Sequence, residues 1–330
     1  MLVTDNKKDR VEFHVEKEFR ESSITVCPRI CDNTGRSHSE KHCLLTYIST
    51  TSELTDPTLP NKTLASEPES VYEYKHHSWR KVWLNDNDEY HRNGDKPAVF
   101  YENGTQMWYQ NGKKHRDNGP TVIKNDGTQK WYQNDKKHRE NGPAVIKKNG
   151  HNEWWVNGEL HHDNGPAIIH SDGQQAWYNH GRLHRENGPA IIYGDGQEKW
   201  YQNGELHRLD GPAVIGHRHK EWWVNGQLHR HNAPAIVSQH YQQWYKNGKL
   251  HRDGDNPAIT RDNGSKEWLR NGQYHRENGP AIILADSSEK WMQNGQLHRE
   301  NGPAIVLADG GGEWWENGHF LRYGRSYKKL

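Results

Sequence analysis

The stretch His184–Gly204, HRENGPAIIYGDGQEKWYQNG, is the unit from which most of this 330-residue chain is built. The same phrase recurs from about residue 83 to residue 318, and its tryptophans, such as Trp177 and Trp200, return every 23 residues. A fixed period of this length is typical of a solenoid-like array, in which one unit cannot bury its apolar face alone.

Each unit carries the signals of an antiparallel hairpin. A short β-branched run, Pro189–Tyr193, is followed by Asp195-Gly196, then by Glu198–Tyr201, and finally by Asn203-Gly204. Asp-Gly and Asn-Gly favour tight turns between strands because their residues tolerate positive φ. The next piece, Leu206–Pro212, is expected to connect one hairpin to the next.

Length differences between units support this division, because turns accept insertions and strands do not. Ala213–Trp222 is one residue shorter than Ala190–Trp200, and the deletion falls at the Asp-Gly turn. The segments His91–Pro97 and His251–Pro257 are each one residue longer than His184–Pro189, in the connecting loop.

The pattern W-x-x-N-G-x-x-H, followed by a glycine before a small residue and by D-G before the next aromatic residue, resembles a variant of the MORN repeat. It is most similar to the tryptophan-rich NGxxHRxxGPA arrays of large DNA viruses and some bacteria. The resemblance covers about three-quarters of the chain and departs from the family in the extra residues between His and Gly. It implies stacked hairpins that serve as an interaction platform, and it implies no catalysis.

The sequence therefore predicts an all-β protein, an elongated single-layer array of about ten stacked antiparallel hairpins at residues 71–322. A mostly irregular, Cys- and His-containing segment is expected at 1–48, and a flexible Ser/Thr/Pro-rich linker at 49–70. Residues 323–330 form a short basic tail.

Composition limits the partners and the compartment. The chain has 44 basic and 43 acidic residues, a balance that makes nucleic acid an unlikely partner and gives only weak attraction to an anionic membrane surface. There is no apolar run of about 20 residues for a transmembrane segment and no visible secretory signal. Three cysteines fit a reducing compartment, so a cytoplasmic protein is expected, or a virion component if the protein is viral.

Tryptophan and histidine recur in step with the repeat, and both are assigned structural roles. Equivalent positions in neighbouring hairpins lie two strands apart, about 10 Å, so they cannot share a zinc ion whose bonds to nitrogen are about 2.0–2.1 Å long. Each histidine is therefore expected to hydrogen-bond turn backbone. The structural residues are Trp108, Trp131, Trp154, Trp177, Trp200, Trp222, Trp244, Trp268, Trp291 and Trp314, with His115, His138, His161, His184, His207, His229, His251, His275 and His298.

The N-terminal segment holds weak candidates for a metal site. They are Cys27, Cys31, His38, His42 and Cys43. Five potential ligands within 17 residues can build a small zinc site. The alternative is a set of free thiols in a flexible segment, since the spacing after Cys31 is short for familiar zinc fingers. No catalytic residue, cofactor or cofactor site is predicted anywhere in the chain.

An arginine follows most of the repeat histidines, as at Arg185. A row of guanidinium groups can bind phosphates of lipids or nucleic acids. Acidic residues such as Glu186 stand next to many of these arginines, however, so a mixed-sign surface network is the competing interpretation.

A second aromatic residue follows most of the tryptophans, and neighbouring strand positions point to opposite faces. If this second row is exposed, it forms a continuous aromatic surface of the kind that marks a partner site. The alternative is that the connecting loops cover it. The residues are Tyr109, Tyr132, Trp155, Tyr178, Tyr201, Trp223, Tyr245 and Trp315.

The leading hypothesis is a non-catalytic repeat scaffold that binds other proteins and associates with itself through its sheet edges. By resemblance alone, it could be a viral structural or virus-factory component. The alternative is a peripheral membrane or phospholipid-binding adaptor that uses the arginine row and the tail residues Arg322, Arg325, Lys328 and Lys329. An enzyme is the least favoured reading, because no nucleophile elbow, P-loop or HExxH motif occurs.

The histidine content predicts loss of stability in mild acid. The chain has 24 histidines, and protonation below a pH of about 6 would add positive charges along the row of repeat histidines and remove hydrogen-bond acceptors. The melting temperature should therefore be lower at pH 5.5 than at pH 7.5. An unchanged thermal melt would contradict the structural role given to these side chains.

Overall fold

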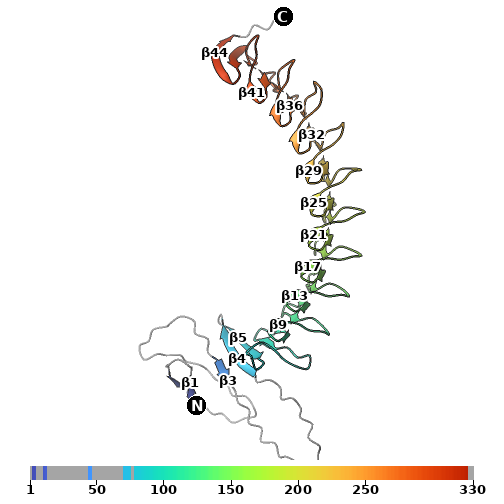
Figure 1. Cartoon of the computed structure of the whole chain (residues 1–330), viewed down its shortest axis with the longest axis vertical. Coiled ribbons are helices and arrows are strands. Elements are labelled where there is room, and N and C mark those ends of the chain that lie inside the picture. The colour runs from blue at the N-terminus through green and yellow to red at the C-terminus, as the bar shows by residue number, and fades with distance from the viewer. Residues whose placement is uncertain (1, 5–9, 13–43, 47–69, 76–77, 326–330) are drawn as a thin grey trace, which may run out of the picture. The chain divides into compact units, whose positions relative to one another are not determined.

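The computed structural model describes residues 2–4, 10–12, 44–46, 70–75 and 78–325, in which every regular element is a β-strand (Figure 1). The chain forms two compact units, residues 1–136 and residues 137–330. Antiparallel strands in hairpin-like pairs build an unclosed sheet, as the repeat predicts. The predicted linker at 49–70 lies outside the described residues except for Ser70, and most of the predicted segment 1–48 does so as well.

In the first unit, most strands join one antiparallel sheet, and its core contains Val71, Val82 and Val99. A separate pair, β1 (Leu2–Thr4) and β2 (Arg10–Glu12), lies outside that sheet. In order of pairing, the sheet contains β3 (Leu44–Thr46), β4 (Ser70–Lys75), β5 (Ser78–Trp83), β6 (Val99–Tyr101), β7 (Gln106–Met107), β10 (Val122–Ile123) and β11 (Gln129–Lys130). The short strands beside it are β8 (Tyr109–Gln110), β9 (Lys113–Lys114) and β12 (Tyr132–Gln133), with β13 (Lys136–Lys137) at the boundary.

The second unit contains a longer antiparallel sheet, whose strands pair with one another in chain order. These strands are β14 (Val145–Ile146), β15 (Asn152–Glu153), β18 (Ile168–Ile169), β19 (Gln175–Ala176), β22 (Ile191–Ile192), β23 (Glu198–Lys199), β26 (Val214–Ile215), β27 (His219–Glu221), β30 (Ile236–Ser238), β31 (Tyr241–Gln243), β34 (Ile259–Arg261), β35 (Lys266–Glu267), β38 (Ile282–Ile283), β39 (Glu289–Lys290), β42 (Ile305–Val306), β43 (Gly311–Glu316) and β44 (His319–Arg325).

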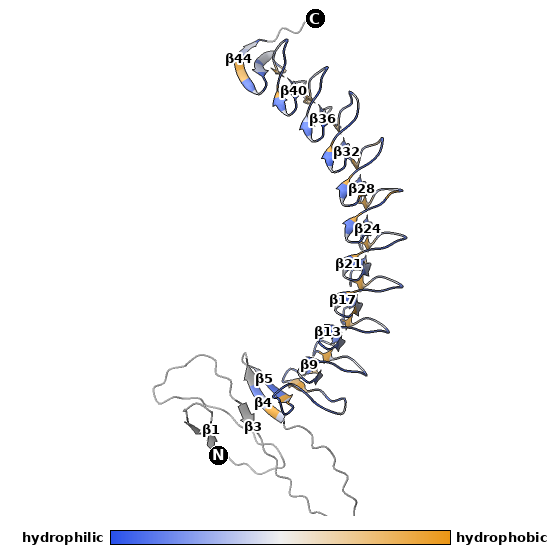
Figure 2. Cartoon of the chain, in the orientation of Figure 1, coloured by the Kyte–Doolittle hydropathy of each residue, from blue (hydrophilic) through white to orange (hydrophobic). Residues whose placement is uncertain are grey.

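A row of small two-stranded hairpins accompanies this sheet, one for each repeat. Figure 2 shows hydrophilic (blue) and hydrophobic (orange) segments recurring from repeat to repeat along the array. The hairpins are β16 (Trp155–Val156) with β17 (Glu159–Leu160), β20 (Tyr178–Asn179) with β21 (Arg182–Leu183), β24 (Tyr201–Gln202) with β25 (Glu205–Leu206), β28 (Trp223–Val224) with β29 (Gln227–Leu228), β32 (Tyr245–Lys246) with β33 (Lys249–Leu250), β36 (Leu269–Arg270) with β37 (Gln273–Tyr274), and β40 (Met292–Gln293) with β41 (Gln296–Leu297).

Both predicted turns close hairpins, but the two hairpins belong to different ladders. The Asp-Gly turn joins β22 to β23 in the long sheet, and the Asn-Gly turn joins β24 to β25 in a small hairpin. Asn203 and Gly204 have φ of 52° and 90°, as a turn with two left-handed residues requires. Trp200 stands between β23 and β24, where the chain passes from one ladder to the other.

Backbone hydrogen bonds connect successive repeats on both ladders. The Trp200 N–H donates to the carbonyl of Ala213 in the next repeat, at 2.7 Å. On the small hairpins, the N–H of Gly204 donates to the carbonyl of Leu183 in the preceding repeat, at 2.8 Å. Each repeat is therefore held to its neighbour at two places, which explains why a 23-residue unit does not stand alone.

A small residue after each repeat proline lies completely inside the fold. Ala190, Ala213 and Ala258 are 0% exposed, and a partly or fully buried Val or Ile follows each. Because the backbones approach closely at this position, a few methyl groups fill the interior, and a composition of only 31% apolar residues suffices.

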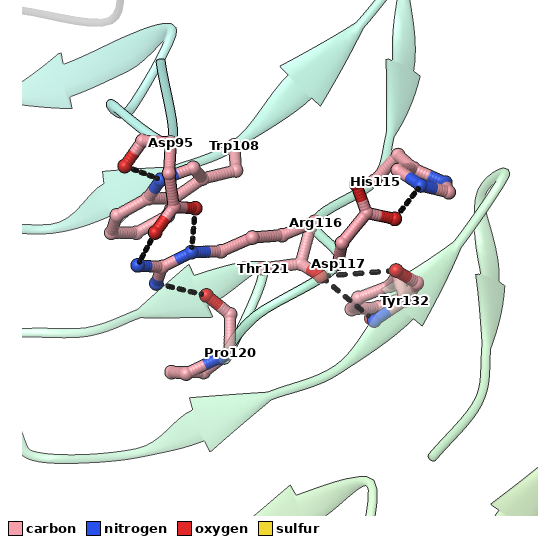
Figure 3. Close-up of polar contacts among 8 residues, drawn as sticks. All are labelled: Asp95, Trp108, His115, Arg116, Asp117, Pro120, Thr121 and Tyr132. Carbon is pink, nitrogen blue, oxygen red and sulfur yellow. Dashed lines mark hydrogen bonds and ion pairs between the residues drawn. The ribbon is translucent and has the colours of Figure 1, made fainter. Parts of the chain in front are cut away.

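Thr121 replaces this alanine in one repeat of the first unit and is also 0% exposed. Its hydroxyl donates to the carbonyl of Tyr132 at 3.1 Å and accepts from the N–H of Tyr132 at 2.9 Å (Figure 3). The hydroxyl thus provides hydrogen bonds to the carbonyl and the N–H of Tyr132 that an alanine side chain cannot provide.

We predict that Thr121→Ala lowers the stability of the first unit by about 1 kcal/mol, because the side chain fits but two hydrogen bonds are lost. Thr121→Val should cost more, about 1–3 kcal/mol, since a methyl group then faces the backbone of Tyr132. Melting temperatures of the two variants and of the unchanged protein test the order. A valine variant as stable as the parent would contradict the role of the hydroxyl.

Candidate functional site

The connecting loops are built around a stacked pair of side chains. The Cζ atom of Arg185 lies 3.9 Å from the ring centroid of Trp177, and its Nη1 donates to the carbonyl of Pro189 at 3.1 Å. A Cβ added to Gly188 would lie 3.1 Å from the same Cζ atom. The guanidinium therefore lies between the indole and the glycine, which cation–π attraction and packing both favour.

The same stack recurs along the chain. Centroid distances range from 3.7 to 4.1 Å in the pairs Trp83–Arg92, Trp108–Arg116, Trp177–Arg185, Trp200–Arg208, Trp222–Arg230, Trp244–Arg252, Trp268–Arg276, Trp291–Arg299 and Trp314–Arg322.

One repeat keeps this geometry with a different side chain. His162 stacks on Trp154 with a centroid distance of 4.8 Å and an interplanar angle of 7°. Its Nδ1 lies 3.0 Å from the carbonyl oxygen of Pro166, and Gly165 stands where Gly188 does in the arginine repeat. The position thus takes a flat side chain with an N–H donor.

These contacts change the interpretation of the arginine row. The sequence suggested a surface network between each arginine and the acidic residue beside it. Instead, Asp117 pairs with His115, and Asp253 pairs with His251 and Lys246. The arginine side chains are directed onto the tryptophans, a partnership eight residues apart that the sequence analysis missed. The recurrence of Arg eight residues after Trp in most repeats, usually followed by Gly before the next Pro, was the available signal.

A carboxylate from the preceding loop binds the stacked arginine in one repeat of the first unit. Arg116 donates from Nε to Oδ1 of Asp95 at 2.6 Å and from Nη2 to Oδ2 at 2.9 Å (Figure 3). The backbone carbonyl of Asp95 also accepts from Nε1 of Trp108 at 3.1 Å. The hydrogen bonds from Arg116 hold the pKa of Asp95 below its usual value.

The second unit repeats this arrangement. Arg276 donates from Nε and Nη2 to the two carboxylate oxygens of Asp255, at 2.6 and 2.9 Å, and the pKa of Asp255 is lowered by these bonds. Asp95 and Asp255 both lie in the connecting loops that are one residue longer than the others. The tryptophans next to them, Trp108 and Trp268, are each only 6% exposed. An inserted loop residue therefore closes the space beside the indole.

Grooves lie between successive loops. The groove that contains Asp95 has a volume of about 240 Å³ and is lined by Trp108 and Arg116, among others. Between two loops of the usual length, a groove of about 500 Å³ is lined by Arg185, Trp200 and Arg208. Arg208 has one ion pair there, from Nε to Asp210 of its own loop at 2.9 Å. The groove between these two short loops is therefore larger than the groove that contains Asp95.

The repeat histidines contact the turn of the following small hairpin. Nδ1 of His184 accepts from the backbone N–H of Asn203 at 3.1 Å. Equivalent bonds of 3.0 to 3.3 Å join His91, His138, His161, His207, His229, His251, His275 and His298 to the next turn. His115 differs, since its buried Nδ1 has no hydrogen-bond partner in the described part of the chain. Protonation of Nδ1 would remove this acceptor, which is the residue-level reason to expect acid sensitivity.

The second aromatic row lies on the small hairpins, except for Trp315 on β43, and is neither buried nor fully exposed. Tyr178 faces Leu183 and Tyr201 faces Leu206 across their hairpins. Burial raises the pKa of both tyrosines, and it raises that of Tyr109 to about 12. Partial exposure is shared by the whole predicted set of Tyr109, Tyr132, Trp155, Tyr178, Tyr201, Trp223, Tyr245 and Trp315.

The predicted metal site in the N-terminal segment lies outside the described residues. Its candidate ligands are Cys27, Cys31, His38, His42 and Cys43. Among the residues that the structure describes, no group of three or more His, Cys, Asp or Glu is arranged to hold a metal ion. Within the same residues, no helix has the length and apolar character needed to cross a membrane.

Comparison with known proteins gives no relative: no protein-family model matches the chain, and no curated protein matches it in sequence.

We predict that Asp255→Asn lowers stability by about 0–1 kcal/mol at neutral pH, a small effect because this carboxylate is half exposed. The folded-state pKa of Asp255 is lowered, so its contribution is complete above the ordinary aspartate pKa of about 3.9 and is lost as the pH falls below it. The difference in melting temperature between parent and variant should therefore shrink between pH 5 and pH 3. A difference that stays constant over this range would contradict the ion pair.

Proposed function

We propose that this chain is a non-catalytic repeat scaffold of the MORN-like kind that binds other proteins along its array. The observation that carries the proposal is the recurrence of one surface, a tryptophan under a stacked arginine, in consecutive repeats, with a groove between the loops of Arg185 and Arg208. A row of equivalent shallow sites suits a partner that makes several contacts at once, since linked contacts reinforce one another. The repeats vary in loop length and do not gather an acid, a base and a nucleophile at one point, which favours binding over catalysis.

The last strand supports a second mode of protein binding, self-association through a sheet edge. β44 pairs with β43, and in the described residues no other strand pairs with it. Its Leu321 and Tyr323 side chains are 58% and 73% exposed. An edge strand with exposed apolar side chains is a template for pairing with another chain.

Phospholipid binding is the alternative function, and the stacked arginines give it less support than the sequence did. Each guanidinium lies on an indole and, in most repeats, donates to a proline carbonyl, so it is not extended toward a membrane surface. For localisation we propose the cytoplasm, or a virion if the protein is viral.

Affinity capture with the full chain and flotation with anionic liposomes test the proposal together. We expect a specific set of captured proteins, and we expect their recovery to fall when residues 190–212, one repeat, are removed in phase. Liposomes should not bind at physiological salt. Salt-sensitive flotation without captured proteins would favour the membrane adaptor instead. Light scattering of Leu321→Lys beside the parent separates self-association from capture of other proteins.

A further inference from the structure

The two long loops each supply a carboxylate that binds a stacked arginine of the same chain. In both, an aspartate reaches across from the preceding loop and bonds to Nε and Nη2 of the arginine that is stacked on tryptophan. The pairs Asp95–Arg116 and Asp255–Arg276 have the same two distances, 2.6 and 2.9 Å. A two-pronged bond of this kind is the preferred geometry between guanidinium and carboxylate. These loops therefore show what the groove beside a stacked arginine accepts.

Where the preceding loop has the usual short length, the groove (a short-loop groove) contains the same arginine without that carboxylate. Arg185, Arg230 and Arg252 each donate from Nη1 to their proline carbonyl, at 3.1 to 3.2 Å. Within the described residues, none of the three forms an ion pair, and their Nε and Nη2 atoms have no hydrogen-bond partner. The two nitrogen atoms that hold Asp95 and Asp255 elsewhere are thus available for a ligand.

Partial burial makes these arginines favourable sites for an anion. Burial against the indole, without a nearby carboxylate, lowers the pKa of Arg230 and Arg252. Burial also lowers the pKa of Arg299, which is stacked on Trp291, although the carboxylate of Glu289 opposes this shift. A cation that has lost water without gaining a counter-charge is stabilised when a carboxylate arrives.

An unpaired indole adds a second polar group to the groove beside Arg299, which lies beyond Asp255 in the array. Nε1 of Trp291 is buried and has no hydrogen-bond partner within the described residues. The equivalent nitrogen of Trp108 donates to the backbone carbonyl of Asp95. Trp268 is different, because Asp255 supplies a carboxylate to its groove while its Nε1 stays unpaired. A peptide can offer both the carboxylate and the carbonyl that these groups lack.

We propose that the short-loop grooves bind the Asp or Glu side chains of an extended acidic segment of a partner protein, one carboxylate for each repeat. The inference rests on the proposed scaffold function and names its partner chemistry. Four consecutive repeats carry the stacked arginine, at 185, 208, 230 and 252. In one of them, Nε of Arg208 donates to the exposed Asp210 of its own loop, which a partner carboxylate must displace. The series is bounded by His162 before it and by the groove closed by Asp255 after it.

The spacing of the carboxylates follows from sheet geometry. Successive repeats are two strands apart, about 9.4–9.8 Å. A segment in the extended polyproline II conformation has three residues per turn and advances about 3.1 Å for each residue. An acidic residue at every third position therefore lies on the same side of the segment and meets successive grooves, and four grooves take about ten residues. Lipid or nucleic-acid phosphates fit less well, because Glu186 and Asp210 also line one of the open grooves and oppose a dense negative charge.

The probe is a ten-residue peptide with aspartate at positions 1, 4, 7 and 10 and uncharged residues between them. Its controls carry asparagine at those positions, or four adjacent aspartates. Titration into the full-length protein, followed by fluorescence anisotropy, should show salt-sensitive binding of the first peptide only. Equal binding of the peptide with adjacent aspartates would overturn the one-carboxylate-per-repeat arrangement.

Loop exchange tests the grooves without altering any arginine. Residues 209–211 and 231–233 are replaced by Asn-Gly-Asp-Lys, the sequence of residues 93–96, which brings an internal aspartate to Arg230 and Arg252. The matched control receives Asn-Gly-Asn-Lys, so that loop length is the same and only the carboxylate is missing. We expect peptide affinity to fall about tenfold for each groove closed by aspartate, and to fall less in the control. Equal losses in both variants would overturn the inference.

A gain-of-binding variant and a competition complete the test. Asp255→Ala should free Arg276, extend the series by one groove and tighten binding of a thirteen-residue peptide with five aspartates. Inorganic phosphate that displaces the peptide at lower concentration than acetate would assign the grooves to phosphate groups and overturn the proposal. Captured partner proteins that lack acidic segments, together with no peptide binding, would refute this inference and leave the scaffold function standing.

Discussion

The backbone and side chain of one tryptophan connect each repeat of this fold to the next. The Trp200 N–H donates to the carbonyl of Ala213 in the following repeat, while its own carbonyl accepts from the N–H of His207, which closes the small hairpin. The guanidinium of Arg208 stacks on its indole. Because one residue fixes the sheet, the hairpin and the loop, the 23-residue period of the sequence becomes a regular step in space.

The Asn-Gly and Asp-Gly turns made the fold predictable from the sequence. Asn-Gly requires two left-handed residues, Asp-Gly requires one, and every length change falls between strands, so an all-β array of hairpins follows from local rules. The second ladder could not be predicted in the same way. Adjacent aromatic residues such as Trp200 and Tyr201 were expected to alternate across one sheet, but Trp200 lies between strands and Tyr201 starts another hairpin. The alternation of side chains along a strand does not show where the strand ends when the residues that follow it also have high β propensity.

The candidate site was only partly predictable, because its partners are not neighbours in the sequence. Acidic residues next to the arginines suggested local ion pairs. In the structure, however, the guanidinium stacks on the indole that lies eight residues earlier. Contact with the flat indole removes water from the cation, and surface pairing gains little in return for ordering two flexible side chains. Asp95 and Arg116 are separated by 21 residues, and only the stacking of repeats brings them together. The extra loop residue was visible in the sequence, but its meaning depended on that stacking.

Loop length therefore does more than vary a surface turn. One additional residue places an aspartate over the stacked arginine, so a groove is closed by a change that leaves strands, tryptophan and arginine untouched. The near balance of 44 basic and 43 acidic residues fits this arrangement, because the chain as a whole produces no long-range field that attracts any polyanion, and recognition depends on the individual grooves. Selectivity in such an array comes from which repeats carry short loops and in what order, since a partner must place its carboxylates at the same intervals. The pattern of loop lengths along the chain is thus the part of the sequence in which we infer that partner choice is encoded.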